Sequence, residues 1–162
     1  VQPRVGTVDA AVRYGIDLAE LTDALGADGR PGETHVVTLP RAIAGTPGLP
    51  WAGLAPRLLV VGVGSGTPAD LRRAGAAVAR ATRGLRRVVT TVGADAGPAG
   101  VRALTEGYLL AAYRHPSAAS AGRDRPATEL VLLGDHDPGA VDAARRQARA
   151  AWVARALSAE PS

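Results

Sequence analysis

The stretch from Leu58 to Thr82, LLVVGVGSGTPADLRRAGAAVARAT, decides the fold, because it runs an apolar strand through a glycine-rich turn into a helix. Thr67 and Pro68 predict the start of that helix, since threonine is a good N-cap and the first helical position does not need the N–H that proline lacks. Apolar side chains then recur on one side of the helix and arginines on the other. The stretch is typical of a strand–turn–helix unit in an α/β protein.

The same unit recurs along the chain. Strands are expected at residues 58–63, 87–92 and 129–133, each followed by a helix, with a further β-rich segment at 34–39. The strands 58–63 and 130–133 are continuously apolar, as in sheets that helices cover on both faces. This order predicts an α/β fold of three layers, in which helices flank a mostly parallel sheet.

The first 33 residues give weaker signals. The segment Arg4–Arg13 is compatible with a strand, and Leu18–Leu25 with a short helix that Gly26 ends. A loop rich in proline and glycine is expected from Pro40 to Pro56, and a low-complexity loop from Ser117 to Arg125.

The composition points to one globular domain. The chain has 162 residues, of which 46% are apolar and 21% charged, and its longest apolar runs are far too short to span a bilayer. It contains no cysteine, which excludes disulfides and thiolate metal sites and favours the cytoplasm. It also lacks lysine, asparagine and phenylalanine. Because the chain has no initiator methionine, we expect that residues were removed before Val1 and that the chain is a piece of a longer protein.

The glycine-rich turn fails the known phosphate-loop patterns. The third glycine of a dinucleotide fingerprint is replaced by Thr67, a Walker loop needs a lysine, and Ser65 lies directly between glycines rather than in G-x-S-x-G. A weak anion site at Gly64, Ser65, Gly66 and Thr67 is the remaining functional interpretation. A purely structural corner is favoured over it, since such a turn needs glycine with or without a ligand.

Other chemically capable residues lack partners in the sequence. Asp135, His136 and Asp137 are consecutive, and adjacent residues rarely converge on one metal ion, so Asp137 is better explained as a helix cap. His35, His115 and Glu106 stand alone in their segments. The sequence therefore predicts no catalytic residue, no cofactor site and no metal site in this chain.

Several segments in order carry a family resemblance. They are RLLVVGVGSG, RRVVTTVG, ALTEGYLLAAYRH, ATELVLLG and the final ARALSAEPS. Together they resemble the amino-terminal domain of the cytosolic leucyl aminopeptidase family. The most specific piece is Glu106–Arg114, which is similar to that family's E-G-x-x-L-x-x-Y-x segment, although His115 and Pro116 then depart from the family's pattern. The similarity covers Arg57–Ser162, and residues 1–56 match loosely.

The resemblance implies a noncatalytic domain at residues 1–157 with a macro-domain-like topology. Residues 158–162 would begin the link to an absent carboxy-terminal catalytic domain. Family members are metal-dependent exopeptidases whose two divalent ions, zinc or manganese, are held in that other domain by a lysine and acidic residues. No catalytic residue is carried over, and no cofactor is expected here. In the family, this domain helps to assemble a homo-hexamer and shapes access to the active sites. The final helix, with Trp152, is expected to pack against the absent domain.

Two alternatives stay open. A macro-like fold could keep an ADP-ribose or nucleotide pocket around Gly62–Thr67, although macro-domain binders commonly use an asparagine and this chain has none. The net charge of +4 could also serve DNA binding, a side function of some family members, through Arg72, Arg80 and Arg83. The few aromatic residues argue against a nucleic-acid surface. No membrane partner is expected.

Overall fold

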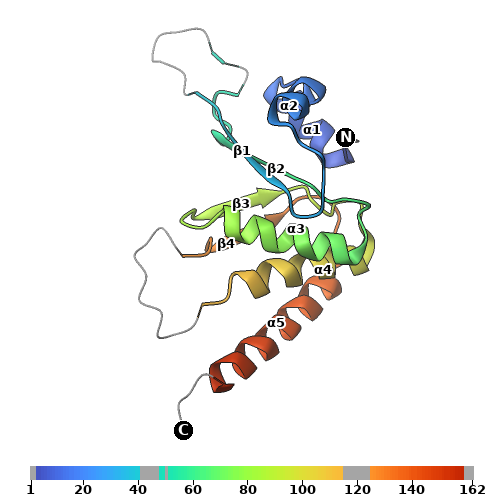
Figure 1. The fold of residues 1–162 in the computed structure, drawn as a ribbon, viewed down its shortest axis with the longest axis vertical. Helices are drawn as coiled ribbons and strands as arrows, with labels where there is room; N and C mark the ends of the chain where they lie inside the picture. Colours follow the sequence, from blue (N-terminus) through green and yellow to red (C-terminus); the bar gives the residue numbers. More distant parts are fainter. Residues whose placement is uncertain (1–2, 41–47, 50, 115–124, 159–162) are drawn as a thin grey trace.

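The computed structural model describes residues 3–40, 48–49, 51–114 and 125–158 (Figure 1). Five helices and four strands form in the described part of the chain. In chain order they are α1 (Val5–Tyr14), α2 (Leu18–Leu25), β1 (Thr34–Thr38), β2 (Arg57–Val61), α3 (Pro68–Ala81), β3 (Arg87–Thr90), α4 (Gly97–Ala111), β4 (Glu129–Leu132) and α5 (Pro138–Ser158). Helices α3 and α5 begin at Pro68 and Pro138, directly after the predicted caps Thr67 and Asp137.

The strand expected over Arg4–Arg13 is wrong, because this segment forms helix α1. Its valines favour a strand in isolation, but Gly15 closes a helix by adopting a left-handed conformation with φ of 64°. The N–H groups of Gly15 and Ile16 donate to carbonyls of the last helical turn. The predicted helix α2 is confirmed, with Asp17 as its N-cap and Gly26 at its carboxyl end.

The strands form two separate two-stranded sheets. Strands β1 and β2 pair antiparallel, with Thr34 opposite Val61, whereas β3 and β4 pair parallel, with Arg87 opposite Glu129. The mixed α/β class is therefore confirmed. The expected single, mostly parallel sheet is not what the described residues form, because β1 runs back along β2 and no ladder joins β2 to β3.

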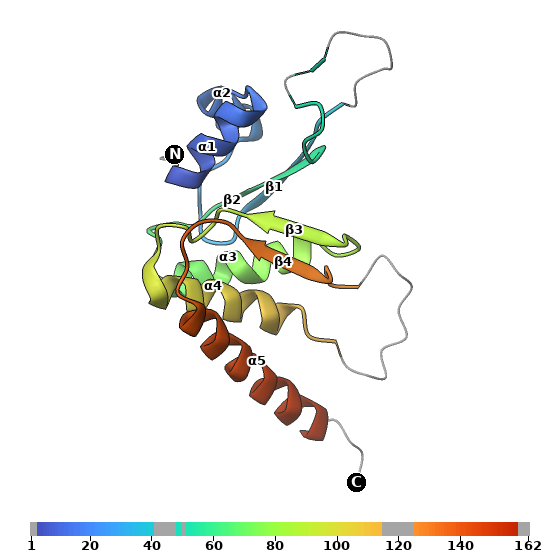
Figure 2. The same cartoon turned by 180° about the vertical axis from the view of Figure 1, so that it is seen from behind.

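The core lies between the strands and the helices α3 and α4. Both figures show these two helices under the strands, with α5 on the far side of α4 and with α1 and α2 above the strands (Figures 1 and 2). Leu59 and Val61 of β2 pack into the same cluster as Val88 of β3 and Tyr108 of α4. On β3, by contrast, Val89 is 54% exposed, so helices do not cover both faces of that strand.

None of the helices in the described ranges is long and apolar enough to cross a bilayer.

Candidate functional site: the glycine corner and its neighbours

The glycine corner connects β2 to α3 and packs against a second turn, at residues 29–32. A Cβ atom on Gly62 would lie 2.1 Å from the Arg30 carbonyl oxygen, and one on Gly64 would lie 2.5 Å from the Pro31 ring. Gly64 and Gly66 also have φ values of 52° and 76°, which side chains other than glycine rarely adopt. The close approach of the two turns therefore accounts for the glycines without a ligand.

The amides of the corner already have acceptors. Gly62 donates to the Glu33 carbonyl at 2.8 Å, Gly64 to the Gly29 carbonyl at 3.0 Å, and Gly66 to the Val63 carbonyl at 2.9 Å. A nest that binds an anion needs such N–H groups to point at the ligand.

Side chains of both charges border the same corner. The Thr67 hydroxyl accepts from the Asp70 amide at 3.2 Å and so caps α3. The Asp70 carboxylate is buried, and its Oδ2 lies 3.2 Å from the position of a Cβ on Gly64, where it would repel a phosphate. Arg73 compensates this carboxylate at 3.5 Å. The Arg4 guanidinium lies beside Gly66.

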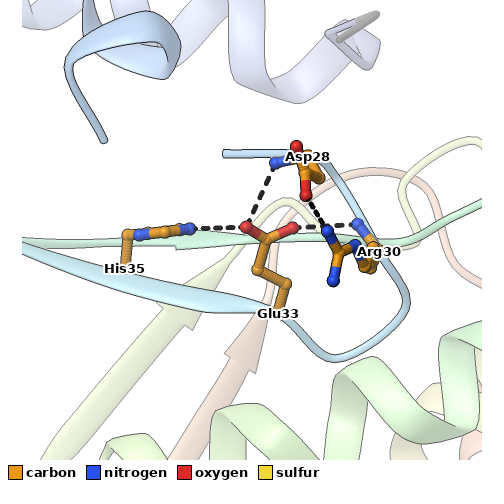
Figure 3. A network of polar contacts seen from close by, with 4 residues as sticks. All are labelled: Asp28, Arg30, Glu33 and His35. Carbon is orange, nitrogen blue, oxygen red and sulfur yellow. Dashed lines mark hydrogen bonds and ion pairs between the residues drawn. The ribbon is translucent and has the colours of Figure 1, made fainter. Parts of the chain in front are cut away.

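A polar network surrounds Glu33 at the start of β1 (Figure 3). One carboxylate oxygen accepts from the Asp28 amide at 3.1 Å and lies 2.8 Å from His35 Nε2, and the other accepts from the Arg30 amide at 2.9 Å. Arg30 also forms an ion pair with Asp28. The hydrogen bond from His35, followed by those from backbone amides, lowers the pKa of Glu33 from 4.5 to about 2.

Sequence reasoning missed this network. His35 was expected to lack a partner, and the structure gives it the carboxylate of Glu33. The signal was the spacing of two residues, because Glu33 directly precedes β1 and side chains two apart along an extended segment point to the same side. The network ties the turn at residues 28–33 to β1. This turn also supplies the carbonyl groups that accept from Gly62 and Gly64 of the glycine corner.

The segment Glu106–Tyr108 holds α4 against α3. The Glu106 carboxylate, 7% exposed, accepts from Arg72 Nη2 at 2.8 Å. A Cβ atom on Gly107 would lie 2.1 Å from the Arg72 carbonyl oxygen, and one on Gly75 would lie 2.1 Å from that of Leu104. Tyr108 is buried in the core next to this crossing, and burial raises the pKa of its hydroxyl. Glu106, expected to stand alone, thus has a partner on the neighbouring helix.

The residues Asp135, His136 and Asp137 do not converge. Asp137 caps α5 by accepting from the Gly139 amide at 2.9 Å, while His136 Nε2 lies 2.8 Å from the Leu133 carbonyl oxygen. Within the described ranges, no group of three histidine, aspartate or glutamate side chains could hold a metal ion. His115 lies outside the described residues.

The aromatic residues at the end of α4 and on α5 form a small cluster. The rings of Tyr113 and Trp152 lie 6.0 Å apart, and the Arg155 guanidinium lies 5.6 Å from the Tyr113 ring. Trp152 is therefore covered in part by α4. The exposed apolar side chains of α5 are Val153 and Leu157, at 54% and 65%.

Comparisons with known proteins point to one family. The sequence profile described as "Cytosol aminopeptidase family, N-terminal domain" matches residues 7–122. No curated protein sequence was found to match the chain.

Solved structures extend the likeness to the fold. The chain is similar to the bottromycin maturation enzyme BotP, with 26% identity, 91% of this chain covered and a TM-score of 0.68. The structure of BotP in complex with Mn gives 26% identity, the same coverage and a TM-score of 0.63. A tomato leucine aminopeptidase mutant gives 17% identity, 97% coverage and a TM-score of 0.68. The chain spans 31%, 30% and 31% of these three proteins, respectively.

Proposed function

Because the chain belongs to the cytosol aminopeptidase family, whose N-terminal domain it contains, we propose that it is the noncatalytic N-terminal domain of a metal-dependent leucyl aminopeptidase. The parent enzyme would release amino-terminal residues from peptides in the cytoplasm. Residues 1–157 would form the domain, and residues 158–162 would begin the link to the catalytic domain.

The observation that carries this proposal is that the acidic side chains with structural partners bind other groups of this chain. Glu106 is paired with Arg72 on the neighbouring helix, Asp70 with Arg73, and Glu33 with backbone amides and His35. The first of these contacts joins α4 to α3, the second lies within α3, and the third ties the turn at residues 28–33 to β1. Residues that would act as a general acid or base must face a substrate, whereas these support a scaffold.

The scaffold would act in assembly and in access to the active sites. Val153 and Leu157 leave an apolar strip on the carboxyl half of α5, which we propose to pack against the catalytic domain. Contacts of this kind would also build the homo-oligomer of the parent, a hexamer, with a macro-domain-like arrangement of the sheet in each subunit.

The two divalent ions of the parent, zinc or manganese, would lie in the catalytic domain. Such ions polarise a carbonyl group and activate water. The described residues of this chain do not fit them, because no cluster of three candidate ligands exists there. No step of hydrolysis is therefore assigned to this chain.

Incubation of the purified chain with leucine p-nitroanilide and Mn²⁺ tests the proposal. We expect no release of p-nitroaniline above the buffer rate, while an intact leucine aminopeptidase under the same conditions is active. Turnover that follows the chain through gel filtration would contradict a noncatalytic role.

The nucleotide alternative gains no support from the corner, whose glycine amides have backbone acceptors and whose border includes the buried Asp70 carboxylate. Saturable heat in a calorimetric titration with ADP-ribose would favour a nucleotide-binding function. For DNA binding, Arg72 is engaged by Glu106, while Arg80 and Arg83 are exposed. Affinity for DNA that falls steeply with salt would favour that function.

A further inference from the structure

A groove lies between helices α4 and α5, which are side by side in both views (Figures 1 and 2). The buried residues of α5 are alanines four positions apart, Ala140, Ala144 and Ala148. Because alanine side chains are short, a helix can approach its neighbour closely along such a row. The longer side chains on the flank of the contact then form the walls of the groove.

The groove has an apolar floor and a cationic rim. It is lined by Leu109, Arg145, Arg146, Ala148, Arg149 and Trp152. Ala148 is buried and Leu109 and Trp152 are partly buried, whereas the three arginines are exposed. The volume is about 320 Å³, at the lower end of the range of roughly 300–1,000 Å³ that is typical of ligand pockets. Such a volume suits one or two side chains of a partner.

The described part of the chain does not compensate the positive charge of the rim. Arg145 lies 3.7 Å from Asp142, but both side chains are largely exposed, so water screens this pair. Arg146 and Arg149 form no ion pair or hydrogen bond in the described ranges. Arg149 also lies one helical turn from each of the other two arginines, a spacing at which like charges repel. A carboxylate bound between them would relieve this repulsion and form charge-assisted hydrogen bonds.

The aromatic content of the groove favours a peptide over a nucleic acid. Trp152 is the one aromatic residue among the described residues that line it, and its ring lies 6.0 Å from that of Tyr113. Single-stranded nucleic acids stack successive bases on several exposed rings, which this groove does not offer. An aliphatic side chain, in contrast, would bury apolar area against Leu109 and Trp152.

We propose that this groove binds an acidic peptide segment of a partner protein, in which carboxylates flank one bulky aliphatic side chain. The aliphatic side chain would lie on Leu109 and Trp152. The carboxylates would pair with Arg146 and Arg149, the two arginines without a partner in the described chain. This proposal does not depend on the activity of the parent enzyme.

Fluorescence anisotropy with a labelled heptapeptide tests the proposal. The probe has capped ends and a central leucine, with glutamates on both sides. We expect saturable binding that Arg146→Glu or Arg149→Glu weakens by about tenfold or more, because reversal removes an ion pair and adds repulsion. Arg80→Glu is the matched control, since Arg80 is an exposed arginine on α3, across α4 from the groove. Absence of saturable binding, or equal losses in the groove and control variants, would overturn the proposal.

Changes in the peptide test the two parts of the groove without altering the protein. Replacement of the glutamates by glutamines should abolish saturable binding. Replacement of the central leucine by serine should weaken binding by about fivefold or more, because the apolar floor then loses its contact. A serine peptide that binds as tightly as the leucine peptide would contradict the proposal.

The rival occupants are a nucleic acid and a second copy of this chain. A single-stranded oligonucleotide with the same number of negative charges should displace the peptide only at higher concentration. Displacement at equal or lower concentration would assign the groove to nucleic acid. A dimer that Arg149→Glu converts to a monomer, measured by light scattering, would assign it to a second copy. Either result would overturn the proposal.

Discussion

Gly107 is one of two glycines, with Gly75, at which the backbones of α3 and α4 approach most closely. Its substitution by alanine would push a Cβ atom to within 2.1 Å of the Arg72 carbonyl oxygen, which cannot rotate away as a side chain could. We predict that Gly107→Ala lowers the free energy of unfolding by roughly 1–3 kcal/mol in urea denaturation, although alanine is the better helix former. Gly48→Ala serves as the control, because no atom lies within 4 Å of its added Cβ. A Gly107→Ala protein as stable as the parent would show that the helices can separate freely.

Glu33 should make stability depend on pH. Its folded-state pKa, about 2, lies below the ordinary value of 4.5, so the ionised carboxylate favours the folded state above pH 4.5. That contribution disappears as the pH falls from about 4.5 to about 2. We predict that Glu33→Gln is less stable than the parent at pH 7 and that thermal melts of the two converge at low pH. Asp9→Asn, an exposed carboxylate on α1, is the control. A difference that stays constant with pH would contradict this reading of the network.

At the scale of elements, the ion pair between Glu106 and Arg72 should couple α4 to α3. A double-mutant cycle with Glu106→Gln and Arg72→Ala is expected to give a coupling energy of about 1 kcal/mol, because the carboxylate is buried while the arginine is 51% exposed. The pair Asp142 and Arg145 is the control, since both side chains are largely exposed at 3.7 Å. Its coupling should be close to zero. Equal coupling in the two cycles would mean that burial adds nothing.

The elements were largely predictable from local chemistry. Thr67, Pro68 and Asp137 marked the helix starts because capping depends on the few residues at a helix end. Segment Arg4–Arg13 was misread, since its valines suit a strand and the deciding signal was the left-handed Gly15 after it. Pairing between strands was harder, because apolar runs do not say which edge meets which.

For the candidate sites too, features set by neighbouring residues were predictable, and contacts between distant segments were not. The structural reading of the glycine corner needs the turn at residues 29–32, which meets it only in three dimensions. The partners of Glu106 and Glu33 were also missed: Arg72 lies 34 residues from Glu106, while Asp28, Arg30 and His35 are near Glu33 but depend on the turn and strand geometry.

At the scale of the whole molecule, the apolar strip on α5 should govern association. We predict that Val153→Glu with Leu157→Glu reduces self-association of the chain in sedimentation, because both side chains are more than half exposed. The thermal stability should change little. Val12→Glu, at a 79% exposed position on α1, is the control. If the α5 variant self-associates as much as the parent in sedimentation, the surface that mediates association lies elsewhere.

The backbone contact of α3 and α4 at Gly75 and Gly107 has a mechanical consequence for a larger enzyme. Because the backbones of the two helices are in contact without intervening side chains, we expect α3 and α4 to move together as one rigid body. Any bending of the described fold should then occur outside this pair of helices, for example where α5 meets α4.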